Sequence, residues 1–332
     1  MPYRPDMDPE VRDWLLDTDP ALRWQVERDL LDEPEPVWRA TRELMATEGM
    51  AARLLRLQDP DGQWAGGAFF PTRRDPRALV TPGDEDRPLC QPWTATTWTL
   101  ATLREWGLDA ALLAGTAERL TTVRWEYDDL PYWGGEVDAC INAKTLATGA
   151  WLGADVEPIV TWFLEHQLPD GGWNCEWVEG STRSSFHSTI NSLAGILWWE
   201  QHTGRDDLRD ARHRAEEYLL ERRLMYRLSS GEPVGPWVRL LHYPFRAVYS
   251  SLRALDHLRR ASATDGAPPD PRAAEAVEVL RSQRHEDGRW YQGYRLPGER
   301  WFEIDVPVGE PSPWLTLHAL RVLRWWDAGQ RS

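Results

Sequence analysis

The chain has 332 residues, a formal net charge of −15 and 21 tryptophans. An acidic balance of this size argues against nucleic-acid binding, because phosphate contacts need a basic surface. The N-terminus is polar and no apolar run approaches about 18 residues, so we expect no signal peptide, no membrane span and a cytoplasmic location. Three cysteines, an odd number, argue against a disulfide framework and favour free thiols or metal ligands.

Two classes of helix are expected to alternate along the chain. One class is rich in small and aromatic residues and apolar on nearly every side, which predicts burial all round. Its expected members are 21–31, 92–106, 138–152, 186–199, 244–258 and 313–326. The other class is charged and amphipathic, and it belongs outside. Its expected members are 37–57, 110–123, 156–167, 208–227 and 272–283.

A repeated turn joins the two classes. Each copy is a helix end followed by glutamine, an Asp-Gly turn and tryptophan, and the copies lie at 54–64, 163–173 and 279–290. Glycine permits the positive φ of the turn. The glutamine side chain is expected to bond nearby helix ends, while the tryptophan covers the turn. A repeat of this kind predicts one all-α domain.

Three types of zinc ligand stand at the starts of two predicted buried helices. Asp138 and Cys140 are two residues apart, and His187 follows one repeat later. Carboxylate, thiol and imidazole are ligands that zinc takes, and helix N-termini stabilise carboxylates and thiolates. A simpler alternative stays open, in which Asp138 only caps its helix, Cys140 is a small buried residue and His187 is a core histidine.

These segments resemble the beta subunits of protein prenyltransferases, whose zinc is held by an Asp-x-Cys pair at one inner-helix start and a histidine at the next. The repeated turn resembles the QW motif of squalene-hopene cyclases and related triterpene cyclases, which share the toroid of those subunits. The resemblance implies a single (α/α)6 toroid of six inner and six outer helices over residues 1–332, with insertions at about 65–91 and 291–310. It also implies Zn2+ held by Asp138, Cys140 and His187.

Residues at other inner-helix starts are expected at the same cavity mouth. The candidates for contact with substrate are Trp93, Trp133, His242 and Trp314. The candidate catalytic residues are Asp138, Tyr243, Arg246 and Lys144, which is the one lysine of the chain. Cys90 or Cys175 is a candidate fourth zinc ligand. The basic residues with which prenyltransferases hold a diphosphate are missing, since Cys90, the residues around Tyr132 and Trp133, and Ile141 occupy those positions.

Three functions are consistent with these residues. The leading hypothesis is a zinc-dependent enzyme acting on a small apolar substrate in a Trp-lined cavity, with zinc activating a bound thiol, water or carbonyl. The second is a metal-free, acid-catalysed terpenoid cyclase in which Asp138 donates the proton, although Ala139 replaces the aspartate that follows in the cyclase motif. The third is a non-catalytic toroid that binds a lipid-like ligand or a protein partner, with any zinc closed by four protein ligands.

Overall fold

The structure is a computed structural model that describes residues 7–71, 93–126 and 128–331. Across these ranges the secondary structure is helical, with isolated β-bridges and no strand, so the predicted all-α class is confirmed. In the same ranges every helix is too short or too polar to cross a membrane. The chain divides into two compact units, which are described separately. The single domain and the closed (α/α)6 toroid stay predictions.

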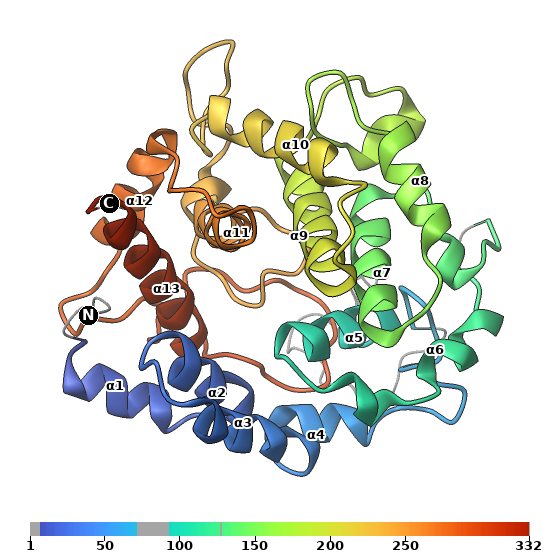
Figure 1. Ribbon diagram of the computed structural model, residues 1–332, viewed down its shortest axis with the longest axis horizontal. Coiled ribbons are helices and arrows are strands. Elements are labelled where there is room, and N and C mark those ends of the chain that lie inside the picture. Colours follow the sequence, from blue (N-terminus) through green and yellow to red (C-terminus); the bar gives the residue numbers. More distant parts are fainter. Residues whose placement is uncertain (1–6, 72–92, 127, 332) are drawn as a thin grey trace. The chain divides into compact units, whose positions relative to one another are not determined.

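The unit that carries the metal motif comprises Met45–His213 and Leu296–Ile304. Its helices are α4 (Gly49–Leu55), α5 (Thr96–Glu105), α6 (Thr116–Arg119), α7 (Ala139–Leu152), α8 (Glu157–Glu165) and α9 (Phe186–Thr203), with 3-10 turns η2 (Ala110–Leu113), η3 (Leu120–Thr122), η4 (Tyr132–Gly134) and η5 (Cys175–Glu179). Helix α7 packs along α9 and beside α5 (Figure 1). We call this the motif unit.

The α7–α9 pair forms the centre of the motif unit. Most of α7 is buried, as its small and apolar composition predicts. The two backbones approach so closely that a Cβ at Gly195 would lie 2.2 Å from the carbonyl oxygen of Ala143. Glycine at position 195 therefore sets how closely α9 can lie against α7.

The second unit comprises Met1–Leu44, Arg214–Arg295 and Asp305–Ser332. Its helices are α1 (Pro9–Leu16), α2 (Pro20–Asp29), α3 (Glu35–Glu43), α11 (Ser251–Asp265), α12 (Ala274–Ser282) and α13 (Pro313–Gly329), with turns η6 (Pro236–Arg239) and η7 (Pro271–Ala273). The units divide within α10 (Arg209–Glu221) and η1 (Leu44–Ala46). Helix α13 packs against α11, α12 and α2, which itself packs on α3 (Figure 1).

Four of the predicted helices are wrong in extent. The expected helix 208–227 ends at Glu221, shortly before Arg223 and Leu224, where φ is 44° and 62°. The expected helix 37–57 is interrupted near Gly49, where φ is 70°, and 110–123 is broken at Gly115, where φ is 77°. The helix expected from residue 244 begins only at Ser251, because Arg246 has a φ of 50° and the backbone up to Ser250 is not helical. Ser250 then caps α11 by accepting a hydrogen bond from the backbone N–H of Arg253. Two glycines with positive φ thus interrupt helices that the composition predicts as continuous. The left-handed Arg246 delays the start of a third helix.

The three glutamine-to-tryptophan turns fold alike. In each, the indole N–H donates to the carbonyl ten residues earlier: Trp64 to Leu54, Trp173 to Phe163 and Trp290 to Leu280, at 2.8, 3.2 and 2.8 Å. The three tryptophans are completely buried. Their backbone N–H groups donate to threonine hydroxyls of the next helix, Thr96, Thr189 and Thr316. Each turn is therefore fixed to the helix before it and the helix after it.

The glutamines behave as the pattern predicts. Gln58 donates to the hydroxyl of Thr116 at 2.9 Å, Gln167 to the carbonyl of Ala211 at 2.7 Å and Gln283 to the carbonyl of Arg239 at 2.7 Å. Each partner lies in or beside a different helical segment of the same unit. These side chains join neighbouring repeats inside each unit.

Candidate metal centre

The segment before α7 is held in place by its own side chains. The amide of Asn142 accepts from the backbone N–H of Glu136 at 2.7 Å and donates to its carbonyl at 2.6 Å. The Trp177 indole donates to the carbonyl of Val137 at 2.8 Å. Asp138 is the N-cap residue of α7, yet its side chain makes no capping hydrogen bond. The capping alternative therefore does not account for this carboxylate.

Two thiols meet at the start of α7. The Sγ of Cys175 lies 3.2 Å from the Sγ of Cys140, and neither is in a disulfide. Ser188 in α9 holds Cys175 from two sides, because its hydroxyl accepts from the Cys175 backbone N–H at 3.1 Å and lies 3.3 Å from the sulfur. The contact joins α7, η5 and α9 at one place. Of the two candidate fourth ligands, Cys175 is therefore next to the motif, whereas Cys90 lies outside the described residues.

His187 is half-buried in the first turn of α9, where its carbonyl accepts from the Asn191 amide at 2.7 Å. Among the described residues, Asp138, Cys140 and His187 do not place one ligand atom each within 4.8 Å of one another. The same holds when Cys175 replaces His187, although Asp138 and Cys140 each interact with Cys175. The structure thus brings the two thiols together, with Cys175 facing both of the predicted ligands on α7.

Lys144 lies one turn along α7 from Cys140. Its side chain is buried, donates to the amide oxygen of Asn191 at 3.2 Å and lies 5.0 Å from the centre of the Trp98 ring. Trp98 in turn packs edge-on against Trp93, with ring centroids 4.6 Å apart. A lysine in this position is an interior cation and not a surface side chain.

The electrostatics of the centre favour a negative sulfur on Cys140. The hydrogen bond from Cys175 lowers the pKa of Cys140, and the positive charge of Lys144 acts in the same direction. The same hydrogen bond, with burial, raises the pKa of Cys175 far above its usual range. Burial raises the pKa of Asp138, an effect that the Cys175 thiol partly opposes. The groups around the pair therefore favour the ionised form of Cys140 over that of Cys175.

The donor set fits zinc in type and in the spacing of its sulfurs. Two ligands about 2.3 Å from a tetrahedral zinc ion lie about 3.8 Å apart, so thiols now 3.2 Å apart need to separate by about half an ångström. Asp138 and His187 would have to turn toward the sulfurs to join them. The residues that fit zinc are therefore Cys140 and Cys175, followed by Asp138 and His187.

Two of the predicted substrate residues lie in the motif unit, and both are buried. Trp93 donates through its indole to the carbonyl of Pro297 at 2.8 Å and packs edge-on against Trp98. Trp133 donates to the carbonyl of Ala117 at 2.9 Å and packs on Tyr132. Trp93 and Lys144 thus contact the same ring, that of Trp98, whereas Trp133 packs between α6 and α7.

The other predicted residues belong to the second unit. Tyr243 stacks on Trp314 with centroids 4.6 Å apart, and its backbone exchanges two hydrogen bonds with the amide of Gln292. His242 is buried near Phe245, and Arg246 follows on the left-handed backbone. The structure brings Tyr243 and Trp314 together, and the prediction that they share a cavity mouth with the metal motif stays a prediction.

Sequence analysis missed a polar cluster on α2, α11 and α13. Asp256 pairs with Arg259 at 2.9 Å and faces the Nδ1 of His318 at 3.5 Å, while Arg321 pairs with Asp29. Burial lowers the pKa of His318. The i, i+3 spacing of Asp256–Arg259 and of His318–Arg321 was the available signal, but these residues lie within stretches whose apolar neighbours dominate the pattern.

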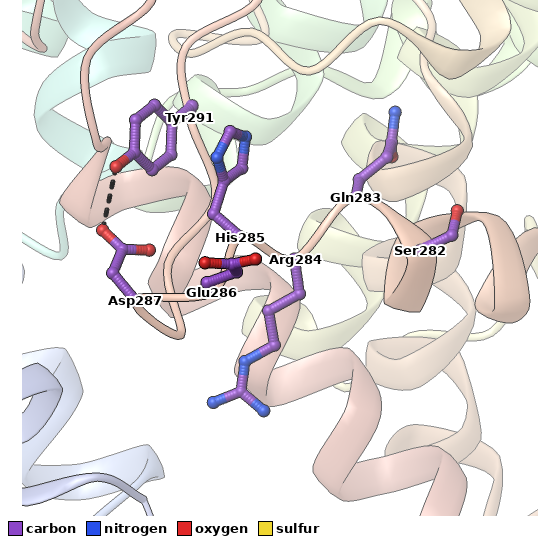
Figure 2. A pocket seen from close by; sticks show the side chains of 7 residues that line it. All are labelled: Ser282, Gln283, Arg284, His285, Glu286, Asp287 and Tyr291. Atoms are coloured by element: carbon purple, nitrogen blue, oxygen red, sulfur yellow. Dashed lines mark hydrogen bonds between the residues drawn. The ribbon is translucent and has the colours of Figure 1, made fainter.

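A surface pocket of about 590 Å³ lies over the third tryptophan turn (Figure 2). In it the ring of His285 stacks on Tyr291 at 3.8 Å, and the Tyr291 hydroxyl donates to Asp287 at 2.9 Å. Its exposed residues belong to the turn and include none of the predicted site residues.

No protein-family model and no curated protein matches the chain. Among solved structures, a protein from Actinoplanes is similar at 17% identity and a TM-score of 0.43, covering 93% of this chain and 90% of its own. A polysaccharide lyase is similar at 12% identity and a TM-score of 0.47, covering 97% of this chain and 98% of its own. At these TM-scores neither likeness bears on function, which is inferred below from the site itself.

Proposed function

We propose that this protein is a zinc-dependent enzyme that acts on a small apolar substrate. The observation that carries the proposal is the contact between Cys140 and Cys175, 3.2 Å apart at the N-terminus of α7 with Asp138 beside them. Two thiols converging from separate segments form a soft donor set that suits zinc. The buried Trp98 beside Lys144, with the buried Trp93 packed against it, supports an apolar substrate.

When bound, zinc would supply a Lewis acid for a thiol, water or carbonyl of the substrate. The chain's own residues have separate parts in this proposal. Lys144 offsets part of the negative charge of the thiolate ligands, and Asn191 fixes the direction of its ammonium group. Ser188 holds Cys175 against Cys140, and the segment at 136–138 is locked by Asn142, so Asp138 starts from a fixed backbone.

Metal analysis of protein purified without added metal tests the proposal. We expect about one equivalent of zinc, falling below about half an equivalent in Cys140→Ser and in Cys175→Ser. A third variant, His187→Gln, tests whether this histidine is a ligand. His202→Gln is its matched control, since His202 is exposed at the far end of the same helix. Substoichiometric zinc that is unchanged in Cys140→Ser would refute the proposal.

The same variants separate an enzyme from a binding protein. Loss of zinc in both Cys175→Ser and His187→Gln would indicate four protein ligands, which is the closed arrangement of a structural site. Loss in Cys175→Ser with retention in His187→Gln leaves an open coordination position for substrate. The second result is the one we expect, because Cys175 contacts Cys140 directly.

The metal-free cyclase is supported by one observation, the raised pKa of Asp138, which burial causes. A carboxyl that keeps its proton can act as the acid on a polyene. This alternative predicts cyclised products from a polyene in the presence of a strong chelator, and their loss in Asp138→Asn. Absence of cyclised product in the presence of chelator would exclude the cyclase.

A further inference from the structure

The two thiols of the metal centre are also close enough to react with each other. Bonded sulfurs lie about 2.05 Å apart, so the 3.2 Å between Cys140 and Cys175 leaves about 1.2 Å to close. Both residues are half-buried. Cys140 is in the first turn of α7 and Cys175 opens η5, so a bond between them would join two separate segments.

The local structure maintains this approach. Asn174 caps η5 and its amide also donates to Ser181 and to the carbonyl of Arg183, each at 2.9 Å. The Trp177 indole bonds the carbonyl of Val137, which ties η5 to the segment before α7. Ser188 adds the third tether, from α9. Cys175 therefore faces Cys140 because its backbone is fixed on three sides.

We propose that Cys140 and Cys175 are a modification site at which a hydroperoxide joins the two thiols in a disulfide. The Cys140 sulfur attacks the peroxide, an S–O bond forms as the O–O bond breaks, and water or an alcohol leaves. The Cys175 sulfur then attacks the sulfenic acid, the S–S bond forms and water leaves with the remaining proton. Two thiols and one hydrogen peroxide thus give one disulfide and two waters.

The disulfide and the metal compete for the same sulfurs. Once bonded to each other, Cys140 and Cys175 no longer offer thiolates, so oxidation should release the zinc. This consequence rests on the proposed function, whereas disulfide formation does not. Reduction by a dithiol should restore zinc binding.

The test uses the full chain, stripped of metal, and stoichiometric hydrogen peroxide. Of the three thiols of the chain, we expect two to disappear, the mass to fall by about 2 Da and one cross-linked peptide to contain Cys140 and Cys175. Cys90→Ser should still form this disulfide. Cys175→Ser should instead gain oxygen at Cys140.

Peptide mapping of the oxidised wild-type chain shows whether Cys140 and Cys175 form the disulfide, without any variant. Three remaining thiols, or a disulfide that contains Cys90, would overturn the inference. Zinc binding without the disulfide contradicts this inference alone, and the disulfide without zinc binding contradicts the proposed function alone. Addition of peroxide to zinc-loaded protein should release zinc in step with the loss of two thiols.

Discussion

Asp305 should make the protein less stable as the pH rises. Its Oδ2 accepts from the hydroxyl of Ser312 at 2.6 Å, whereas its Oδ1 is buried with no hydrogen-bond partner among the described residues. Burial raises the pKa of Asp305 from 3.8 to about 7. The folded carboxyl holds its proton more tightly than the unfolded one. The contribution of Asp305 to the free energy of unfolding is therefore most favourable below the unfolded pKa of 3.8, and it becomes less favourable as the pH rises to about 7.

The size of the effect follows from the two pKa values. With each pKa unit worth about 1.4 kcal/mol, the charge on Asp305 lowers the free energy of unfolding by about 1.7 kcal/mol at pH 5 and about 4.4 kcal/mol at pH 8. The second value is a ceiling, because the residue is only half-buried. Asp305→Asn removes the charge and keeps an acceptor for Ser312, which caps α13 by accepting from the backbone N–H of Leu315. The variant should therefore gain up to about 2.7 kcal/mol more at pH 8 than at pH 5.

Thermal unfolding of wild type and variant at pH 5 and pH 8 measures this difference. About 2–4 °C per kcal/mol gives an extra rise in Tm of roughly 5–10 °C at pH 8. Asp129→Asn, at an exposed loop residue, is the control and should show no such pH dependence. An equal change in Tm for Asp305→Asn at both pH values would refute the reasoning, because the buried carboxyl would then carry no raised pKa.

Three further predictions follow from packing and charge. Gly195→Ala should cost about 1–3 kcal/mol in unfolding free energy, because its Cβ meets the carbonyl of Ala143; unchanged urea unfolding would contradict this close approach. Thr189→Val and Thr316→Val should each lower the free energy of unfolding by about 1–3 kcal/mol, since each leaves the backbone N–H of a buried tryptophan unpaired. A neutral result for one variant alone in urea unfolding would show that the two turns differ. Farnesyl diphosphate should bind more weakly than about 100 μM by calorimetry, because the cation beside Cys140 is a lysine already directed at Asn191; micromolar binding lost in Lys144→Ala would contradict this.

The sequence was most informative where composition and local chemistry agree. The buried helices at 138–152 and 313–326 correspond to α7 and α13 within a few residues. Small residues followed by the left-handed Gly153 favour the bounds of α7. The capping Ser312 and Pro313 favour the start of α13. The tryptophan turns also fold as predicted. In contrast, proline before α11 suggested an early start, but Arg246 adopts a left-handed conformation that composition does not reveal.

The candidate site was harder to predict for a similar reason. Asp138 and Cys140 both stand at the start of α7, so their presence at one helix end follows from spacing alone. Cys175 reaches Cys140 only because Asn174 and Ser188 fix a short 3-10 turn across from α7, and such tertiary placement has no periodic signal. His187 stands at the helix start that the repeat predicts, but a position in a repeat does not fix the direction of a side chain. Its imidazole therefore does not meet Asp138 and Cys140 as a set of three ligands.

The burial of Lys144 has a practical consequence for following motions of the metal centre. An acylating reagent has one side-chain amine to find in this sequence, that of Lys144, a residue only 7% exposed whose amine bonds across from α7 to Asn191 of α9. Acylation at Lys144 therefore reports only molecules in which these two helices have separated. The rate of labelling would measure local opening of this part of the chain directly, with no added probe and no competing side-chain amine.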